Sequence, residues 1–296
     1  QIKVESSFMC GIVGYVGTKN VPGRAYFALD VVLEGLRRLE YRGYDSAGVA
    51  VLDEGKISFR KKAGKVAALD EVIAANPLPQ AVVGIGHTRW ATHGGPTDAN
   101  AHPHVVDGGK LAVVHNGIIE NFAELKTELA EKGYTFKSET DTEVAATLLS
   151  DFMHGAGEGD LTESMRLTCN RLEGAFTLLA LHTDFPDRIV AARRNSPLVI
   201  GLGEGENFLG SDVSGFIDYT KNAVEMANDQ IVTITATSYN IIDFAGNKAQ
   251  GKPFKVEWDA AAAEKGGFSS FMEKEIHDQP TAVRDTLMGR FDENGK

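Results

Sequence analysis

Residues 174–244 read GAFTLLALHTDFPDRIVAARRNSPLVIGLGEGENFLGSDVSGFIDYTKNAVEMANDQIVTITATSYNIIDF, and this stretch decides the fold class. Apolar runs of strand length follow one another here, divided by Gly, Pro, Asn and Asp, the residues that favour turns. The runs are AFTLLALH, RIVAAR, PLVIGLG, NFLGSD, QIVTIT and YNIIDF. This spacing predicts a series of short β-strands.

The sequence before this stretch combines further strands with helices. Strand-length apolar runs occupy residues 11–17, 47–53, 56–61, 81–87 and 111–115. Glu54-Gly55 separates the second run from the third and indicates a hairpin. Apolar residues spaced three and four apart predict helices over residues 25–39, 122–132, 140–152 and 161–172. Many short strands covered by helices imply a layered α+β domain.

The composition is that of a globular protein with an acidic surface. The chain has 296 residues, of which 43% are hydrophobic, and a formal charge of −11. Such a charge disfavours nucleic acid and anionic membranes as partners, because both attract clustered Lys and Arg. No apolar run approaches the ~18 residues of a membrane span. The two cysteines, Cys10 and Cys169, are too few for a disulfide framework, so we expect a cytoplasmic protein.

Cys10 is the first residue with a candidate catalytic role. It follows Met9 directly, so removal of Met9 would place the thiol beside a free α-amine of the same residue. That amine has an ordinary pKa of about 7.7–8.0, against about 10.4 for lysine, and can act as a base near neutral pH. An N-terminal cysteine therefore supplies a nucleophile and its base together. The alternative is a small buried apolar residue at a strand start, as we expect for Cys169 on its helix.

Four other residues have the groups that an amide-cleaving site requires. Asn116 and Gly117 can donate a side-chain and a backbone N–H to a developing oxyanion, although Asn-Gly is also a common turn. Arg89 can hold a carboxylate through two parallel hydrogen bonds, or be a surface arginine at a strand end. Asp141, in the first turn of a predicted helix, can bind an ammonium group or simply oppose the helix dipole. The residues alone leave these alternatives open.

Five histidines raise the question of a metal site, which their spacing does not support. They form neither an HExxH motif nor a set with paired Cys-x-x-Cys ligands. The sequence also has no P-loop and no GxGxxG motif for a nucleotide cofactor. We therefore expect neither a metal nor another cofactor. The five are His87, His93, His102, His104 and His115.

Taken together, several segments resemble the glutaminase domain of the glucosamine-6-phosphate synthases. This family belongs to the N-terminal-nucleophile, or class II, glutamine amidotransferases. CGIVG and HNG are shared across that class, whereas EYRGYDSAG and HTRWATHG are more specific to this family. The segments are CGIVG (10–14), LEGLRRLEYRGYDSAG (33–48), HTRWATHG (87–94), NAHPH (100–104), HNGIIEN (115–121), SETDTE (138–143), SPLVIGLG (196–203) and FMEKEIHDQP (271–280).

The resemblance implies a fold and a set of residue roles. The fold would be a four-layer αββα sandwich, with two antiparallel sheets between layers of helices. Cys10 would attack the side-chain amide of glutamine, with its own α-amine relaying protons. The other implied roles are an oxyanion hole from Asn116 and Gly117, binding of the substrate carboxylate by Arg89 and of its ammonium by Asp141, a closing loop lined by Thr92 and His93, and gating of ammonia passage by Trp90.

The resemblance also implies a division of the chain and a set of partners. Residues 1–9 are expected to be a leader or a remnant of expression, 10–246 the glutaminase domain, and 247–296 a linker and the start of a sugar-isomerase domain. A last helix is expected from Pro280 to Gly289. The implied substrate is L-glutamine, and the ammonia would go to fructose 6-phosphate on the isomerase domain of a homo-oligomeric full-length protein. The alternatives are an amidotransferase with a phosphoribosyl or aspartyl acceptor, or a silent glutamine-binding form in which Cys10 is not N-terminal.

Overall fold

The chain forms two compact units, residues 1–257 and 258–296, and each is described by itself. A computed structural model describes residues 10–19, 26–40, 44–257, 276–277 and 279–280. The described residues of the second unit are helical. Most of the helix expected from Pro280 to Gly289 lies outside the described residues, as do residues 1–9.

The described part of the first unit contains both helices and strands. The helices are α1 (Ala28–Leu39), α2 (Val66–Ala75), α3 (Phe122–Glu131), α4 (Asp141–His154) and α5 (Leu161–Arg171). The strands are β1 (Gly11–Gly17), β2 (Ser46–Asp53), β3 (Lys56–Ala63), β4 (Val83–Arg89), β5 (His104–Val106), β6 (Leu111–Ile119), β7 (Gly174–His182), β8 (Arg188–Arg194), β9 (Val199–Leu202), β10 (Glu206–Gly210), β11 (Asn222–Glu225), β12 (Gln230–Thr235), β13 (Tyr239–Asp243), β14 (Lys248–Ala249) and β15 (Lys252–Lys255).

The described strands form two sheets whose neighbouring strands pair antiparallel. The first sheet has the order β15-β11-β9-β10-β1-β4-β2-β3, and the second has the order β14-β13-β12-β8-β7-β6-β5. In the first sheet, β1 lies between β10 and β4 and pairs antiparallel with both. In the second, β6 pairs antiparallel with β5 and β7. Strands β1 and β6 therefore lie in the interior of their sheets, where neighbours on both sides fix their positions.

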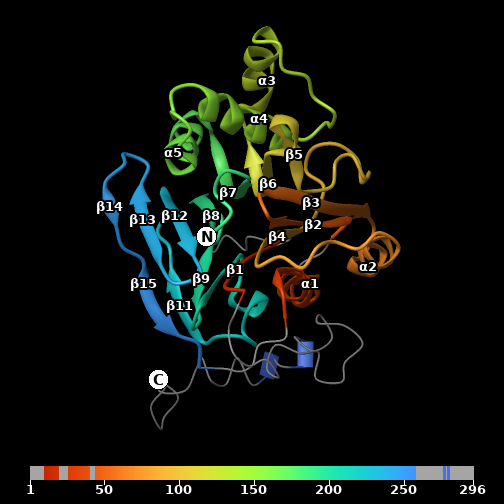
Figure 1. The fold of residues 1–296 in the computed structure, drawn as a ribbon, viewed down its shortest axis with the longest axis vertical. Coiled ribbons are helices and arrows are strands. Elements are labelled where there is room, and N and C mark those ends of the chain that lie inside the picture. Colours follow the sequence, from red (N-terminus) through yellow and green to blue (C-terminus); the bar gives the residue numbers. More distant parts are fainter. Residues whose placement is uncertain (1–9, 20–25, 41–43, 258–275, 278, 281–296) are drawn as a thin grey trace, which may run out of the picture. The chain divides into compact units, whose positions relative to one another are not determined.

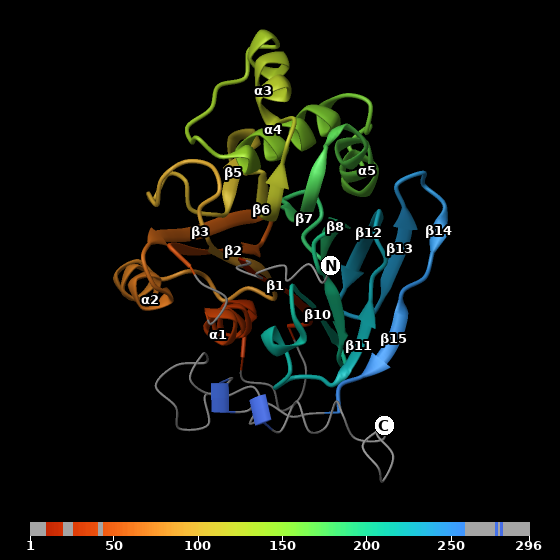
Figure 2. The ribbon, with the colours of Figure 1, turned by 180° about the vertical axis from the view of Figure 1, so that it is seen from behind.

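Three hydrophobic clusters separate four layers of structure. The outer clusters join α1 and α2 to the first sheet, and α3, α4 and α5 to the second sheet. The middle cluster contains residues of both sheets and fills the space between them. Helices α3, α4 and α5 gather at one end of the unit in Figure 1 and again in Figure 2. The α+β class predicted from the strand and helix pattern and the αββα sandwich implied by the family resemblance are confirmed.

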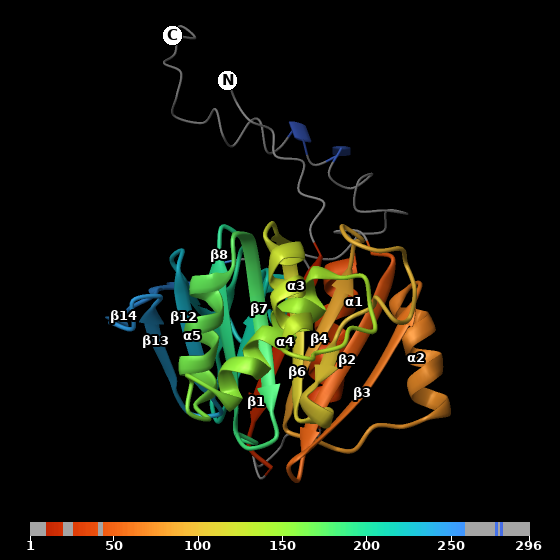
Figure 3. The same cartoon turned by 90° about the horizontal axis from the view of Figure 1, so that it is seen from above.

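The alternation of side chains along β1 explains how one strand serves two of these clusters. Ile12 and Val16 pack into the middle cluster, whereas Val13 and Tyr15 face the outer cluster beside α1. Successive strand residues point to opposite faces, so a strand buried on both sides is apolar throughout. This explains why residues 11–17 read as a continuous apolar run. The helices lie beside the strands they cover in Figure 3.

The hairpin predicted at Glu54-Gly55 is confirmed in detail, and the helix predicted over residues 140–152 begins with a capped turn. Asp53 pairs with Lys56 across the β2–β3 hairpin, and the two turn residues, Glu54 and Gly55, have φ of 48° and 73°. Positive φ at both positions is the geometry of a type I′ turn, which matches the twist of the flanking strands. Thr140 caps α4, since its side chain accepts a hydrogen bond from the Glu143 N–H.

The folded unit extends past the boundary predicted at residue 246. Strand β14 pairs with β13 in the second sheet, and β15 pairs with β11 in the first. Both strands are short, and all four residues of β15 are exposed. Such edge strands lack the alternation of apolar and polar residues that marks a half-buried strand, so their sequence reads as a linker. The end of the domain therefore moves from residue 246 to residue 257.

Candidate functional site

The candidate site lies where the ends of strands from both sheets meet. Cys10 directly precedes β1, and the register of β1 against β4 places Gly11 opposite Thr88. The residues just beyond this pair, Cys10 and Arg89, are therefore neighbours. A Cβ on Gly11 would lie 2.6 Å from Thr88 Oγ1 and 2.8 Å from Leu39 Cβ, so the residue after the cysteine must be glycine. This close packing fixes the backbone that carries the thiol.

The sulfur of Cys10 is held by the backbone of the neighbouring strand end. Its Sγ accepts a hydrogen bond from the Trp90 N–H at 3.0 Å. Burial raises the pKa of the Cys10 thiol, and the Trp90 N–H and the charge of Arg89 oppose that rise. Because burial dominates, the resting sulfur is a neutral thiol and requires a base to become a nucleophilic thiolate.

Asn116 reaches the cysteine from the other sheet. Its Nδ2 donates to the Cys10 carbonyl oxygen at 2.8 Å, and its Oδ1 lies 2.8 Å from His87 Nε2. Asn116 and Gly117 lie within β6, which continues to Ile119, so the turn interpretation of this dipeptide is excluded. The Asn116 side chain is buried and held at both ends, which fixes its position beside the thiol.

Gly117 has a conformation that a side chain would not permit. Its φ is +119°, and a Cβ would lie 2.0 Å from the carbonyl oxygen of Ala175. Ala175 lies on β7, the strand that pairs with this part of β6. Glycine is therefore required here by both the backbone conformation and the close approach of the next strand.

Arg89, at the end of β4, is a buried residue with 3% exposure, which excludes the surface-arginine interpretation. Its guanidinium donates to the carbonyl oxygens of His93, of Gly94 at 3.1 Å and of Gly95 at 3.3 Å. It also lies 3.7 Å from the Asp45 carboxylate. The arginine thus organises the loop that follows β4 and places a fixed positive charge beside the pocket.

Asp141 is the first residue of α4 and supplies a buried negative charge. Its Oδ2 accepts a hydrogen bond from the Ile119 N–H at 2.9 Å, at the end of β6. His93 Nδ1, on the loop after β4, lies 3.8 Å from the same oxygen. The carboxylate lies at the N-terminus of the helix, which is the positive end of the helix dipole. Both readings of Asp141 in the sequence therefore remain compatible: it opposes the helix dipole, and its charge also borders the pocket.

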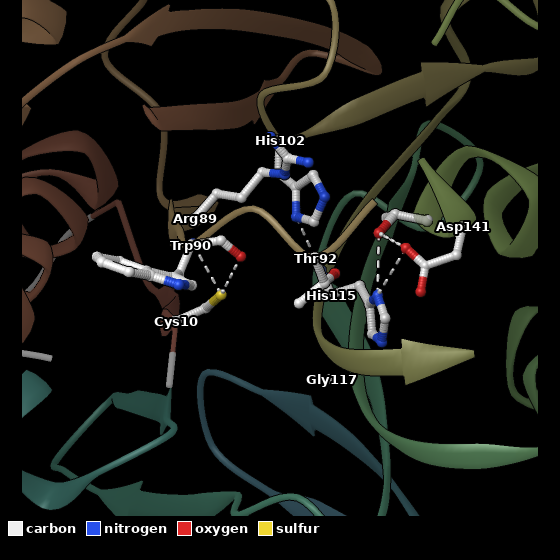
Figure 4. Close-up of a pocket in the computed structure, with 9 residues that line it drawn as sticks. Cys10, Arg89, Trp90, Thr92, His102, His115, Gly117 and Asp141 are labelled. Carbon is white, nitrogen blue, oxygen red and sulfur yellow. Dashed lines mark hydrogen bonds and ion pairs between the residues drawn. The ribbon is translucent and has the colours of Figure 1, made fainter. Parts of the chain in front are cut away.

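These residues surround one pocket (Figure 4). Its volume is about 210 Å³, including the space that is open to solvent. Of the predicted site residues, Asn116 and His93 border this pocket through their contacts with Cys10 and Asp141. The other six line it, together with three residues to which the sequence analysis assigned no site role. The lining residues are Cys10, Arg89, Trp90, Thr92, His102, His115, Gly117, Asp141 and Thr142.

Four of the five histidines gather at the pocket as neutral rings, and two of them, His102 and His115, line it. The ring centroids of His87 and His102 are 4.2 Å apart, and those of His102 and His104 are 5.1 Å apart. Burial lowers the pKa of His87 to about 3 and also lowers the pKa values of His102, His104 and His115. Among the described residues, no group of three His, Cys, Asp or Glu side chains could hold a metal ion.

Sequence reasoning missed two residues that organise the site. Asp45 accepts a hydrogen bond from the Ala91 N–H and lies beside the Arg89 guanidinium. It therefore contacts both the backbone and a side chain at the end of β4. Asn100 donates to the Gly95 carbonyl at 3.0 Å and to Glu139 at 3.1 Å, which links the loop after β4 to the segment before α4. Both lie inside segments that carry the family resemblance, and this resemblance is the signal in the sequence that could have pointed to them.

Comparison with known proteins agrees with the fold. The family described as "Glutamine amidotransferase domain" matches residues 87–218. A solved glutamine phosphoribosylpyrophosphate amidotransferase from B. subtilis superposes with a TM-score of 0.66 at 24% identity, covering 81% of this chain and 50% of that one. At this identity the likeness concerns the fold. Residues 87–218 therefore match a glutamine amidotransferase domain, and the fold of the chain resembles that of a solved amidotransferase.

Curated relatives narrow the family further. The glutamine–fructose-6-phosphate aminotransferases (isomerizing) of Corynebacterium diphtheriae and Corynebacterium efficiens are 77% and 76% identical to the chain over 288 residues. Each alignment covers 97% of the chain and 46% of the relative, so the chain spans just under half the length of these relatives. Over nearly its whole length, the chain is therefore similar to one part of the glutamine–fructose-6-phosphate aminotransferases.

Proposed function

We propose that this domain hydrolyses L-glutamine to glutamate and ammonia at Cys10. The observation that carries the proposal is the convergence on one pocket of a cysteine, an amide donor, an arginine and a carboxylate. Each has a counterpart in the substrate: the scissile amide, the oxyanion that forms from it, the α-carboxylate and the α-ammonium.

In the described part of the chain, no helix has the length and apolar character to cross a membrane.

Cys10 acts as nucleophile and its own α-amine acts as base. The amine takes the proton from the thiol, and Sγ attacks the side-chain carbonyl carbon of glutamine. The resulting tetrahedral intermediate collapses to a thioester, and the same amine returns the proton to the departing nitrogen, which leaves as ammonia. Water then hydrolyses the thioester to glutamate and restores the thiol. Because burial raises the thiol pKa, this base is needed in the first step.

Asn116 and Gly117 stabilise the oxyanion of the tetrahedral intermediate. The Asn116 amide nitrogen has two N–H groups, and one of them is used by the Cys10 carbonyl. The second remains for the oxyanion, beside the sulfur that makes the new bond. Gly117 adds a backbone N–H that no side chain shields. Donors held in place before the reaction stabilise developing charge without reorganising.

Arg89 and Asp141 hold the two charged groups of glutamine. A guanidinium has five N–H donors in a planar fork, and three loop carbonyls occupy part of this set in Arg89. The substrate carboxylate takes the remaining donors or replaces the loop carbonyls. Thr92 and His93 lie on the same loop, so its position responds to whatever the guanidinium binds. The pair of opposite charges selects a free amino acid over a peptide-bound glutamine.

The acceptor of the ammonia belongs to the full-length protein. We infer that a sugar-isomerase domain binds fructose 6-phosphate and converts it, with the released ammonia, to glucosamine 6-phosphate. The support is the name of the curated relatives, which are glutamine–fructose-6-phosphate aminotransferases. Trp90, a residue that is 44% exposed and lies beside the thiol, is proposed to gate the passage of ammonia. The whole protein is proposed to be a cytoplasmic homo-oligomer.

The direct test measures both products from L-glutamine with the domain alone. Ammonia and glutamate are expected in equal amounts, and a rapid acid quench is expected to trap a glutamyl adduct on the peptide that contains Cys10. Mass mapping of the quenched protein identifies the peptide. If glutamine is hydrolysed but the quench at saturating glutamine traps no adduct on Cys10, the nucleophile assignment is contradicted.

A further inference from the structure

His87 is the buried partner of Asn116 on the side away from the cysteine. The two residues come from different sheets, since His87 lies on β4 and Asn116 lies on β6. His87 Nε2 and Asn116 Oδ1 are 2.8 Å apart, and both side chains are buried. The mechanism derived above uses Asn116 but gives no role to His87.

The neighbours of Asn116 determine which way its amide faces. The Cys10 carbonyl oxygen can only accept a hydrogen bond, so the Asn116 atom that faces it at 2.8 Å must be Nδ2. The other end, Oδ1, can only accept, so His87 Nε2 must carry a proton and donate it. A 180° rotation of the amide would place two acceptors against each other at the cysteine. The histidine donor therefore favours one of two amide orientations.

The surroundings of His87 hold this donor in place. Its ring packs against the ring of His102, with centroids 4.2 Å apart and an angle of 30° between the planes. Burial lowers the pKa of His87 to about 3, so the ring stays neutral, with its single proton on Nε2, across the pH range of ordinary enzyme assays. Neutrality matters because a charged ring would require a counter-charge in this buried position.

We propose that His87 is a positioning residue for glutamine hydrolysis: its Nε2–H fixes the Asn116 amide so that Nδ2 faces the oxyanion. The proposal rests on the proposed function, since it concerns the oxyanion hole of that reaction. Without the histidine donor, nothing holds Oδ1 in place, and the amide loses the fixed orientation that presents Nδ2 to the developing negative charge. His87 then acts on kcat through Asn116 and has little effect on the binding of glutamine.

A pair of substitutions that differ in reach provides the test. His87→Gln keeps an N–H donor near the position of Nε2, whereas the shorter amide of His87→Asn stops near the position of Nδ1. The asparagine variant is expected to lose about 10²-fold in kcat, the size of effect seen when one oxyanion donor is removed. The glutamine variant is expected to stay within about 5-fold of the parent protein, and KM for glutamine to change by less than about 3-fold in both.

Two further measurements separate positioning from a general structural defect. Alkylation of Cys10 by iodoacetamide forms no oxyanion, so its rate is expected to be equal in the parent protein and in His87→Asn. In an Asn116→Ala background, His87→Asn is expected to cost little more, because the residue that it positions is gone. Equal kcat for His87→Asn and the parent, equal losses in both His87 variants, or full additivity with Asn116→Ala would each overturn the proposal. If the parent, in the form that begins at Cys10, releases no ammonia, the proposed function fails instead.

Discussion

Replacing Cys10 with alanine is expected to abolish ammonia release from glutamine. Loss of a nucleophile in an acyl-transfer site costs about 10⁴-fold or more in kcat, because the remaining donors stabilise an intermediate that no longer forms. The fold is expected to survive, since Cys10 is only partly buried and its backbone position is set by Gly11. Ammonia release and thermal unfolding, measured on the same preparation, check both parts.

Cys169 offers a matched control for this substitution. It is also a free cysteine, but it lies on the buried face of α5, within the core. Cys169→Ala is expected to lower the melting temperature, because it leaves a small cavity, while the activity of the folded fraction stays near that of the parent. Near-normal ammonia release from Cys10→Ala, in protein free of the parent form, would remove Cys10 from the mechanism.

Replacing Arg89 with lysine is expected to raise KM for glutamine by about 10²-fold or more, with a smaller effect on kcat. Lysine keeps the positive charge but cannot make two parallel hydrogen bonds to a carboxylate. It also cannot bridge the loop carbonyls that the guanidinium now holds. Steady-state kinetics over a wide range of glutamine concentration measures the two parameters separately.

A substrate analogue and a second arginine sharpen this experiment. Glutamine with its α-carboxylate converted to an amide is expected to be a poor substrate for the parent, and Arg89→Lys should discriminate far less between it and glutamine. Arg188→Lys serves as the control, because Arg188 pairs with its neighbour Asp187 on the surface. Unchanged KM in Arg89→Lys, or undiminished discrimination against the analogue, would assign the carboxylate to another residue.

The fold could be predicted from the sequence because its determinants are local. The β2–β3 hairpin follows from Glu54-Gly55 between two strand-length runs, and the start of α4 follows from Thr140 and Glu143. Each signal acts over a few residues, so a linear reading finds it. Strand β15 was missed because an edge strand with four exposed residues has no apolar pattern to detect.

The site could be predicted only as far as individual residues show their chemistry. The sequence left Asn116-Gly117 undecided between a turn and an oxyanion hole, because a strand that contains glycine at φ +119° has no sequence pattern of its own. The contact between His87 and Asn116 joins two sheets, and no spacing rule connects positions 29 apart on different strands. Such contacts depend on how the sheets pack, which only the assembled fold determines.

The central claim is that the free α-amine of Cys10 is the base of the reaction. Two forms of the protein test it most directly: one in which the chain begins at Cys10, and one that retains residues 1–9, with the N-terminus of each verified by intact mass. The form beginning at Cys10 is expected to hydrolyse glutamine, whereas the longer form, with an amide in place of the amine, is expected to be inactive. Equal rates of hydrolysis by the two forms would contradict the account.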